Sequence, residues 1–389
     1  MLGVSLALAG AAAAPRSERA WPWLLAGVGV GLAAATKYTG GIALVPVLTA
    51  ALVVRSPRGA LLAVAGAIVS FLIANPYALL DLHRFRADLS LQKEYSSGSL
   101  GAKLGIGAGG GFAYYAWTLT WGLGWVPALA ALGGAVHLLV RDGTRALFLL
   151  PGPVLFLAYM GTQERYFGRW LLPIFPILAL LAAHGALALA RRVPAPARAA
   201  AVAVAALALL AQGAWDSVRS DRTLARPDTR NEARAWLVAH VPRGSRIVYE
   251  PIVPASWLQD PGAPRPRWAS WHFRHGDSKV PVRVEDYERA LFPRLVRRYR
   301  RQGYCWVITG STQEGRAEAQ PHDVPRAVAY YRTLRRRSRV VARFTPYHRG
   351  AGPVKFNFDW SFDYFPGAFA RPGDEVVVHR LLNCHPYSH

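Results

Sequence analysis

The first half of the chain alternates long apolar runs with short charged loops, a pattern typical of a polytopic membrane protein. A helix needs about 20 mainly apolar residues to cross a hydrocarbon core of about 30 Å. Runs near this length predict seven full spans after a partial one at 1–14: 21–36, 38–54, 59–80, 116–140, 146–161, 169–190 and 198–215. We therefore expect a transmembrane helical bundle over 1–215, with an outer loop at 81–113.

The second half lacks such runs and predicts a small α/β domain over 216–389. Thr229 and Glu232 have the spacing of a capping box at a helix start. Leu291, Leu295 and Tyr299 recur every four residues and predict a helix near 284–301. Short runs rich in β-branched residues predict strands, and a Pro- and Trp-rich stretch predicts a long loop. The strands are 246–250, 304–309, 340–345 and 375–381, and the loop is 251–281.

Arginines in the short loops predict how the chain is oriented. They fall in alternate loops, which the positive-inside rule assigns to the cytoplasm. These are Arg16/Arg19, Arg55/Arg58, Arg141/Arg145 and Arg191/Arg192/Arg198. Lys37, the 81–113 loop, the 162–168 loop and everything after 215 then lie outside. The expected fold is a polytopic α-helical protein of the inner or plasma membrane with a C-terminal extracytoplasmic α/β domain.

A net charge of +23 would ordinarily suggest a nucleic-acid partner, but the composition of this chain weakens that inference. Of 46 basic residues, 41 are Arg, and Ala dominates the apolar runs, as in proteins encoded by G+C-rich genomes. We therefore expect no nucleic-acid partner. The basic runs 297–301 and 335–339 are interpreted as solvated faces or as contacts to anionic lipid or glycan. Cys305 and Cys384 both lie in the outer domain, and whether they pair is left open.

Basic residues at the outer ends of spans are the strongest functional candidates. Lys37, flanked by Thr36 and Tyr38, suits a phosphate or pyrophosphate headgroup at the membrane surface, although a snorkelling lysine in a tight turn fits the same pattern. Arg165 and Arg169 are four residues apart and can clamp an anionic headgroup, with plain interfacial anchoring as the alternative.

Four more residues near the same predicted face are candidates for the donor and acceptor site: Tyr38, Asp81, His83 and Tyr166. The glycine run 105–111 has no preceding strand and is interpreted as a flexible or re-entrant segment. Gly27, Gly29 and Gly31 are interpreted as close helix packing. His272 and His275 have HxxH spacing but no further ligands, so no metal site is predicted, and metal dependence is left open. No cofactor is evident.

Three segments in order resemble family 39-like, lipid-carrier-dependent glycosyltransferases of the GT-C superfamily, relatives of protein O-mannosyltransferases and of the aminoarabinose lipid A transferase. They are AAATKYTGGIALVPVL at 33–48, FLIANPYALLDLHRF at 71–85 and ERYFGRWLLPIFPILALLAAHG at 164–185. The segments 228–250 and 371–381 also resemble the family's soluble part, although Asp374 stands where a proline is usual.

The resemblance implies an inverting transferase acting outside the cytoplasm, among membrane lipids. It would move a sugar from a polyprenyl-phosphate donor to a hydroxyl of an acceptor protein, lipid or glycan. An acidic general base deprotonates the acceptor in such enzymes. That base is expected upstream of Met1, because the chain resembles an N-terminally truncated member, so no catalytic residue is assigned. Lys37, Arg165 and Arg169 match the role of stabilising the leaving phosphate.

The alternative is a catalytically inactive GT-C-like membrane protein that binds lipid-linked sugar or cell-wall glycan. Tryptophans of the second half can stack on sugar rings under either interpretation, and therefore do not discriminate. They are Trp257, Trp268, Trp271, Trp306 and Trp360.

Overall fold

The computed structural model describes residues 1–96, 110–164, 166–242, 245–251, 287–354 and 365–385. The chain divides into two compact units after Ser217. The first is helical and is called the membrane unit below. The second contains the only β-sheet among the described residues and is called the C-terminal unit. Each is described by itself.

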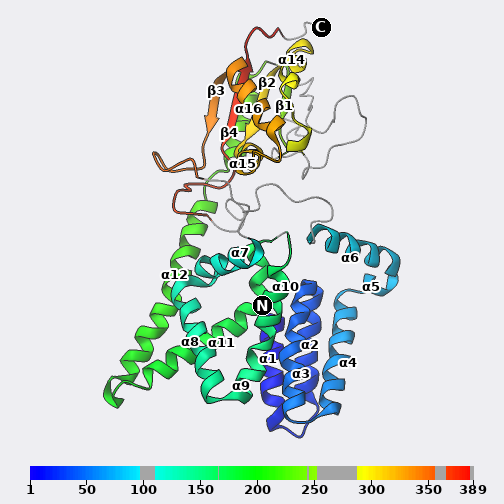
Figure 1. Cartoon of the computed structure of the whole chain (residues 1–389), viewed down its shortest axis with the longest axis vertical. Coiled ribbons are helices and arrows are strands. Elements are labelled where there is room, and N and C mark those ends of the chain that lie inside the picture. The colour runs from blue at the N-terminus through cyan, green and yellow to red at the C-terminus, as the bar shows by residue number, and fades with distance from the viewer. Residues whose placement is uncertain (97–109, 165, 243–244, 252–286, 355–364, 386–389) are drawn as a thin grey trace. The chain divides into compact units, whose positions relative to one another are not determined.

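The described residues of the membrane unit are mainly helical (Figure 1). Its α-helices are α1 (Leu2–Ala13), α2 (Trp21–Thr36), α3 (Leu44–Val53), α4 (Pro57–Ala74), α5 (Tyr77–Leu80), α6 (Leu82–Ser96), α7 (Gly110–Leu119), α8 (Trp125–Arg141), α9 (Gly143–Leu149), α10 (Pro151–Gly161), α11 (Phe175–Ala190) and α12 (Arg198–Leu224), which continues into the C-terminal unit. Shorter segments are η1 (Ala14–Arg16), η2 (Tyr38–Ala43), η3 (Thr120–Gly124), η4 (Gly168–Ile174) and η5 (Ala195–Ala197).

Four helical segments are long and apolar enough to cross a membrane: Pro57–Ala74, Gly110–Arg141, Gly168–Ala190 and Ala195–His240. A fifth span results if the bent pair α9–α10 is counted as one. Two of the seven predicted spans, 21–36 and 38–54, form shorter apolar helices. The second begins with six residues of 3₁₀ helix, η2, before α3 begins.

Glycines let the first helices approach at backbone distance. A Cβ on Gly27 would lie 2.2 Å from the Ala63 carbonyl oxygen, and one on Gly31 would lie 1.9 Å from the Ser70 hydroxyl. A Cβ on Gly29 would lie 2.4 Å from the Ala7 nitrogen. These glycines therefore serve close packing of α2 against α4 and α1, as the sequence predicts.

The long helix from α7 to α8 is interrupted by the π-turn η3, and a side chain satisfies the backbone at the break. Gln212 of α12 donates a hydrogen bond to the Thr120 carbonyl oxygen and accepts one from the Trp125 backbone nitrogen, both at 2.9 Å. Unsatisfied backbone groups are costly in lipid, so this contact stabilises the broken helix. Nearby, α8 and α11 cross at Gly134 and Gly185, where His137 Nδ1 lies 3.0 Å from His184 Nε2.

The C-terminal unit has a four-stranded mixed sheet in the order β1-β2-β4-β3. Strand β1 pairs parallel to β2, whereas β4 pairs antiparallel to both β2 and β3. The strands are β1 (Arg246–Tyr249), β2 (Tyr304–Gly310), β3 (Ser338–Phe344) and β4 (Val376–Leu381). The helices are α13 (Thr229–His240), η8 (Glu288–Ala290), α14 (Arg294–Arg301), α15 (Ser311–Ala319) and α16 (Pro325–Arg337).

All four predicted strands are present, within two residues of their expected ends. Their inner faces and the helices form one hydrophobic core, with Leu237, Val307, Ile308 and Val378 fully buried. The core also contains the disulfide between Cys305 of β2 and Cys384 after β4, whose Cα atoms are 5.4 Å apart. The pairing that the sequence left open is therefore present.

Two predicted helix starts are wrong. Asp228, not Thr229, caps α13, because the Asp228 carboxylate accepts a hydrogen bond from the Arg230 nitrogen while the Thr229 hydroxyl donates to the Asp374 carbonyl oxygen. The helix predicted near 284–301 begins only at Arg294. Pro293 disfavours helical geometry at the residue before it, so the chain reaches α14 through η8 and the extended residue Leu291. The predicted loop 251–281 lies outside the described residues, apart from Pro251.

Candidate functional site

Two breaks of the same kind meet in the membrane unit, each directly before an apolar helix. The 3₁₀ segments η2 and η4 contact each other. Each follows a residue with extended backbone, Lys37 before η2 and Phe167 before η4, and each leads into an apolar helix. The sequence explains the breaks, since Gly40 and Gly41 disfavour a regular helix in one segment and Pro173 does so in the other.

This contact brings Lys37 and the 166–170 segment together. The Lys37 ammonium lies 5.4 Å from the ring centroid of Trp170, a cation–π distance. The neighbouring Arg169 guanidinium lies 4.5 Å from the Phe167 ring. Lys37 is half-buried and Arg169 is exposed. We call Lys37, Phe167, Arg169 and Trp170 the cationic cluster. Arg165 lies outside the described residues.

The 71–85 segment contacts Tyr38, the residue after Lys37. The Tyr38 ring packs against Phe71 at the end of α4 and against Phe85 in α6, with centroids 6.5 and 5.8 Å apart. Asp81 has a structural role as well, because its carboxylate accepts a hydrogen bond from the Arg84 nitrogen in the first turn of α6. His83 is exposed in that same turn.

Tyr166 differs from the other candidates because it is only 5% exposed. Its ring lies 4.6 Å from that of Tyr114 and 6.2 Å from that of Tyr115, both on α7. Tyr166 therefore anchors the 166–170 segment to α7. Its predicted place in a donor or acceptor site stays a prediction.

Sequence reasoning missed an aromatic row on α7 and η3. Tyr114, Trp117 and Trp121 follow one another with ring centroids 5.8 and 5.5 Å apart. A Cβ on Gly168 would lie 2.6 Å from the Trp121 ring, so this glycine lets η4 approach the row. The helical spacing of the three aromatic residues is the sequence signal for this row.

The C-terminal unit contains a cavity of about 760 Å³, which we call the outer cavity. It lies against the ends of β2 and β4, the helices α15 and α16, and the segment 345–354. Its lining is rich in carboxylates: Glu314, Glu318, Asp374 and Glu375. The remaining polar or aromatic lining includes Thr309, Ser311, Thr312, Tyr331, Arg335, Arg343, Tyr347, Phe369 and His379.

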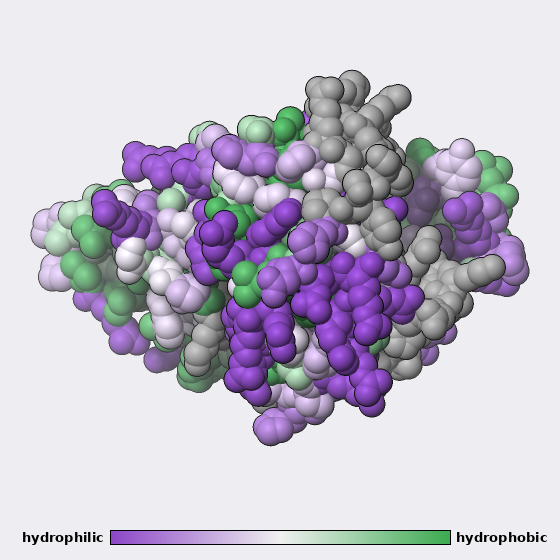
Figure 2. All heavy atoms as spheres, turned by 90° about the horizontal axis from the view of Figure 1, so that it is seen from above, coloured by the Kyte–Doolittle hydropathy of each residue, from purple (hydrophilic) through white to green (hydrophobic). Residues whose placement is uncertain are grey.

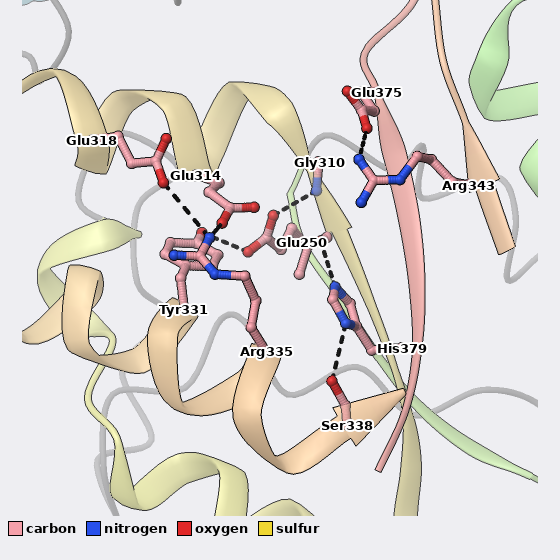
Figure 3. Close-up of polar contacts among 11 residues, drawn as sticks. Glu250, Gly310, Glu314, Glu318, Tyr331, Arg335, Ser338, Arg343, Glu375 and His379 are labelled. Atoms are coloured by element: carbon pink, nitrogen blue, oxygen red, sulfur yellow. Dashed lines mark hydrogen bonds and ion pairs between the residues drawn. The ribbon is translucent and has the colours of Figure 1, made fainter. Parts of the chain in front are cut away.

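A buried glutamate ties the strands to the helices beneath the outer cavity. Glu250 at the end of β1 is fully buried, accepts a hydrogen bond from the Tyr331 hydroxyl at 2.6 Å and accepts another from the Gly310 backbone nitrogen at 2.8 Å (Figure 3). Burial raises the pKa of the Glu250 carboxyl well above its ordinary value. Glu250 therefore fixes Tyr331, one of the lining residues.

Asp374 is the most unusual lining residue. It is 4% exposed, and its Oδ1 accepts a hydrogen bond from the Thr312 hydroxyl at 2.6 Å. Its Oδ2 is buried and has no hydrogen-bond partner among the described residues. Burial raises the pKa of the Asp374 carboxyl to about 6, partly offset by the Thr312 hydrogen bond and by Arg230.

His379 of β4 is the second buried titratable group of the outer cavity. Its Nε2 lies 3.3 Å from the Thr309 hydroxyl. Its Nδ1 lies 3.1 Å from the Ser338 hydroxyl (Figure 3). Burial, with smaller contributions from Arg343 and Arg335, lowers the pKa of His379 to about 4. The imidazole is therefore neutral at pH 7.

Both guanidinium groups of the outer cavity are engaged by carboxylates. Arg335 pairs with Glu314 and lies 3.6 Å from Glu318, and Arg343 pairs with Glu375 (Figure 3). Arg335 belongs to the basic run 335–339, so part of that run neutralises carboxylates. This neutralisation was not predicted from the sequence.

The other basic run contributes to a separate, smaller groove of about 270 Å³ between α14 and α16. Arg294, Arg297 and Arg300 recur every three residues on α14 and line it together with Arg337. All four are exposed. Figure 2 shows one face of the molecule, on which hydrophilic residues predominate.

In the part of the chain that the structure describes, no three His, Cys, Asp or Glu side chains lie close enough together to hold a metal ion. His272 and His275 lie outside it.

Comparisons with known proteins give one distant likeness. No family model matches the chain, and no curated protein matches it. The resemblance to family 39 therefore stays a prediction. The chain is similar to the cryo-EM structure of arabinofuranosyltransferase AftD from mycobacteria, with 19% sequence identity over 98% of this chain and a TM-score of 0.39. The chain spans 30% of the length of that protein.

Proposed function

We propose that this chain belongs to a membrane glycosyltransferase of the GT-C type, resembling family 39, that takes a sugar from a polyprenyl-phosphate donor. The membrane unit binds the lipid phosphate, and the C-terminal unit is extracytoplasmic. The acceptor hydroxyl attacks the anomeric carbon, with inversion, and the lipid phosphate leaves.

The observation that carries the proposal is the cationic cluster at the starts of two apolar helices, where η2 and η4 contact each other. A lysine ammonium and an arginine guanidinium lie on two contacting helix breaks, beside Trp170 and Phe167. A phosphate on a long lipid tail needs cations at the membrane surface and an apolar surface for its chain. Aromatic rings favour the interface between these two environments.

The roles follow from charge and position. Lys37 and Arg169 bind the phosphate and stabilise the negative charge that grows on it as the glycosidic bond breaks. Tyr38 and the start of α6, with Asp81 and His83, border the sugar. Tyr166 holds the Arg169 segment in place through its packing on α7.

The disulfide supports an extracytoplasmic C-terminal unit. Disulfides form and persist in oxidising compartments and are rare in the cytosol. Cys305 and Cys384 are paired inside the core. The alternating arginine-rich loops of the membrane unit independently favour the same orientation.

The test is binding of a short-chain polyprenyl phosphate to the purified chain in nanodiscs, followed by native mass spectrometry. Removing a charge-assisted contact weakens binding by about 1.5–3 kcal/mol, or roughly 10- to 150-fold in Kd. We expect Lys37→Ala to show this loss and Lys37→Arg, which keeps the charge, to lose much less.

Arg58→Ala is the matched control, because Arg58 is an exposed cation in the first turn of α4. Its Kd should equal that of the unmodified chain. An unchanged Kd for Lys37→Ala, or equal losses in Lys37→Ala and Arg58→Ala, would contradict the phosphate site.

A further inference from the structure

The outer cavity combines a volume suited to a small ligand with an unsatisfied buried carboxylate. Ligand pockets range from about 300 to 1,000 Å³, and this cavity has about 760 Å³. Buried polar atoms in proteins are nearly always hydrogen-bonded, so an orphaned carboxylate oxygen calls for a donor. Asp374 Oδ2 is such an atom among the described residues.

The charge of the residues that line the outer cavity indicates which kind of hydrogen-bond donor a ligand can offer there. Four carboxylates face two guanidinium groups, and both guanidinium groups already pair with Glu314 or Glu375. A phosphate or uronate would therefore meet excess negative charge with no unengaged cation among the described lining residues. Hydroxyl groups can donate to these carboxylates without adding charge.

One wall of the outer cavity is aromatic and apolar. Tyr347 and Phe369 meet edge to face with centroids 5.2 Å apart, beside Val340 and Val377. The Tyr347 ring lies directly against Gly352, where a Cβ would lie 2.2 Å from the ring, so the absence of a side chain at Gly352 makes room for the ring. A sugar ring presents C–H groups on its faces and hydroxyl groups on its rim. A lining that combines aromatic rings with carboxylates matches both.

We propose that the outer cavity of the C-terminal unit binds an uncharged saccharide, with ligand hydroxyls donating to Asp374 and a sugar face packing on Tyr347. The site is formed entirely by the C-terminal unit, so it does not depend on the lipid-phosphate site. It gives the chain a carbohydrate-recognition site separate from the cationic cluster.

The test is saturation-transfer NMR and calorimetry on the full chain in a detergent without a sugar headgroup. The probes are linear trisaccharides of glucose, mannose, galactose and arabinose, together with a uronate trisaccharide and spermidine. We expect at least one neutral trisaccharide to bind. Asp374→Asn, which retains an acceptor for Thr312, should weaken that binding by about tenfold or more.

Further variants separate recognition from folding. Tyr347→Ala should weaken binding to a similar extent, and Tyr347→Phe should restore it because the ring remains. The matched control is Asp323→Asn, an exposed carboxylate that accepts a hydrogen bond from Gln320. Thermal unfolding of each variant reports on folding.

Three results would each overturn the proposal. One is that no neutral trisaccharide binds. Another is that the uronate or spermidine binds as tightly as the best neutral probe. The third is that Asp374→Asn and Tyr347→Ala bind like the unmodified chain.

Discussion

The two sites of this molecule differ in charge. The cationic cluster places Lys37 and Arg169 against aromatic rings. The outer cavity places carboxylates inside a folded domain and pairs both of its arginines with them. The first arrangement suits a phosphate, and the second suits a ligand that donates hydrogen bonds without carrying negative charge. The high net positive charge of the whole chain therefore does not describe the outer cavity.

The two units also differ in what stabilises them. The membrane unit depends on glycines that allow backbone contact, such as Gly31 against Ser70. Both units have a cluster of buried hydrophobic residues, and the C-terminal unit adds a disulfide and buried polar contacts, such as Glu250 with Tyr331. A substitution within one unit is therefore expected to leave ligand binding by the other unit unchanged.

The largest expected effect is on the stability of the C-terminal unit. Replacing both Cys305 and Cys384 by Ser removes a crosslink across 79 residues of sequence. The free energy of unfolding should fall by about 2–5 kcal/mol, because the unfolded chain regains conformational freedom. Chemical unfolding followed by tryptophan fluorescence measures this loss.

The same double variant sharpens the comparison between units. Polyprenyl-phosphate binding at the cationic cluster should keep its Kd under conditions in which the C-terminal unit remains folded. A variant that is as stable as the unmodified chain would show that the disulfide adds nothing to the C-terminal unit.

A smaller effect is expected from Asp374→Asn on the pH dependence of stability. Because the pKa of Asp374 is about 6 in the folded state, above its ordinary value of 3.8, its ionisation destabilises the folded state. The Asn variant should match the unmodified chain in pH dependence below about pH 4, gain relative stability between pH 4 and 6, and keep a constant gain above pH 6. The gain is about 1–3 kcal/mol.

Urea unfolding of both proteins from pH 4 to 7.5 tests this expectation, and the difference between them cancels the titration of other groups. A gain in stability together with a loss of saccharide binding would mark Asp374 as a ligand-binding group rather than a structural one. A difference that does not change with pH would contradict the assigned burial of this carboxylate.

Much of the fold could be predicted from the sequence. Runs of β-branched residues predicted all four strands, and the apolar runs predicted the helical membrane unit. Helix starts were harder, because Asp228 and Thr229 are both good caps and only the contact of Thr229 with the distant Asp374 decides between them. The break before α14 is caused by Pro293. The sequence-based prediction gave more weight to the helical spacing of Leu291, Leu295 and Tyr299 and therefore missed this break.

The sites were predictable only in part. Lys37 and Arg169 were chosen as candidates because cations at the ends of apolar runs are conspicuous, and the structure places them at two contacting helix breaks, while their role stays a prediction. The outer cavity was not found, because its residues are remote in sequence and individually ordinary. In the sequence, Arg335 is one residue of a basic run, and only the structure shows that it pairs with Glu314 of α15. Asp374 is likewise an ordinary residue in the sequence, and only the structure shows that it is buried and accepts a hydrogen bond from Thr312.

The central claim is that the cationic cluster binds an anionic lipid phosphate and the outer cavity binds an uncharged saccharide. Its most direct test measures the binding of both ligands to the same two variants. Short-chain polyprenyl phosphate and the best neutral trisaccharide are titrated into Lys37→Ala and Asp374→Asn. We expect Lys37→Ala to lose only the lipid phosphate and Asp374→Asn to lose only the saccharide, each by about tenfold or more. Loss of both ligands in either variant, or of neither ligand in both, would contradict the account.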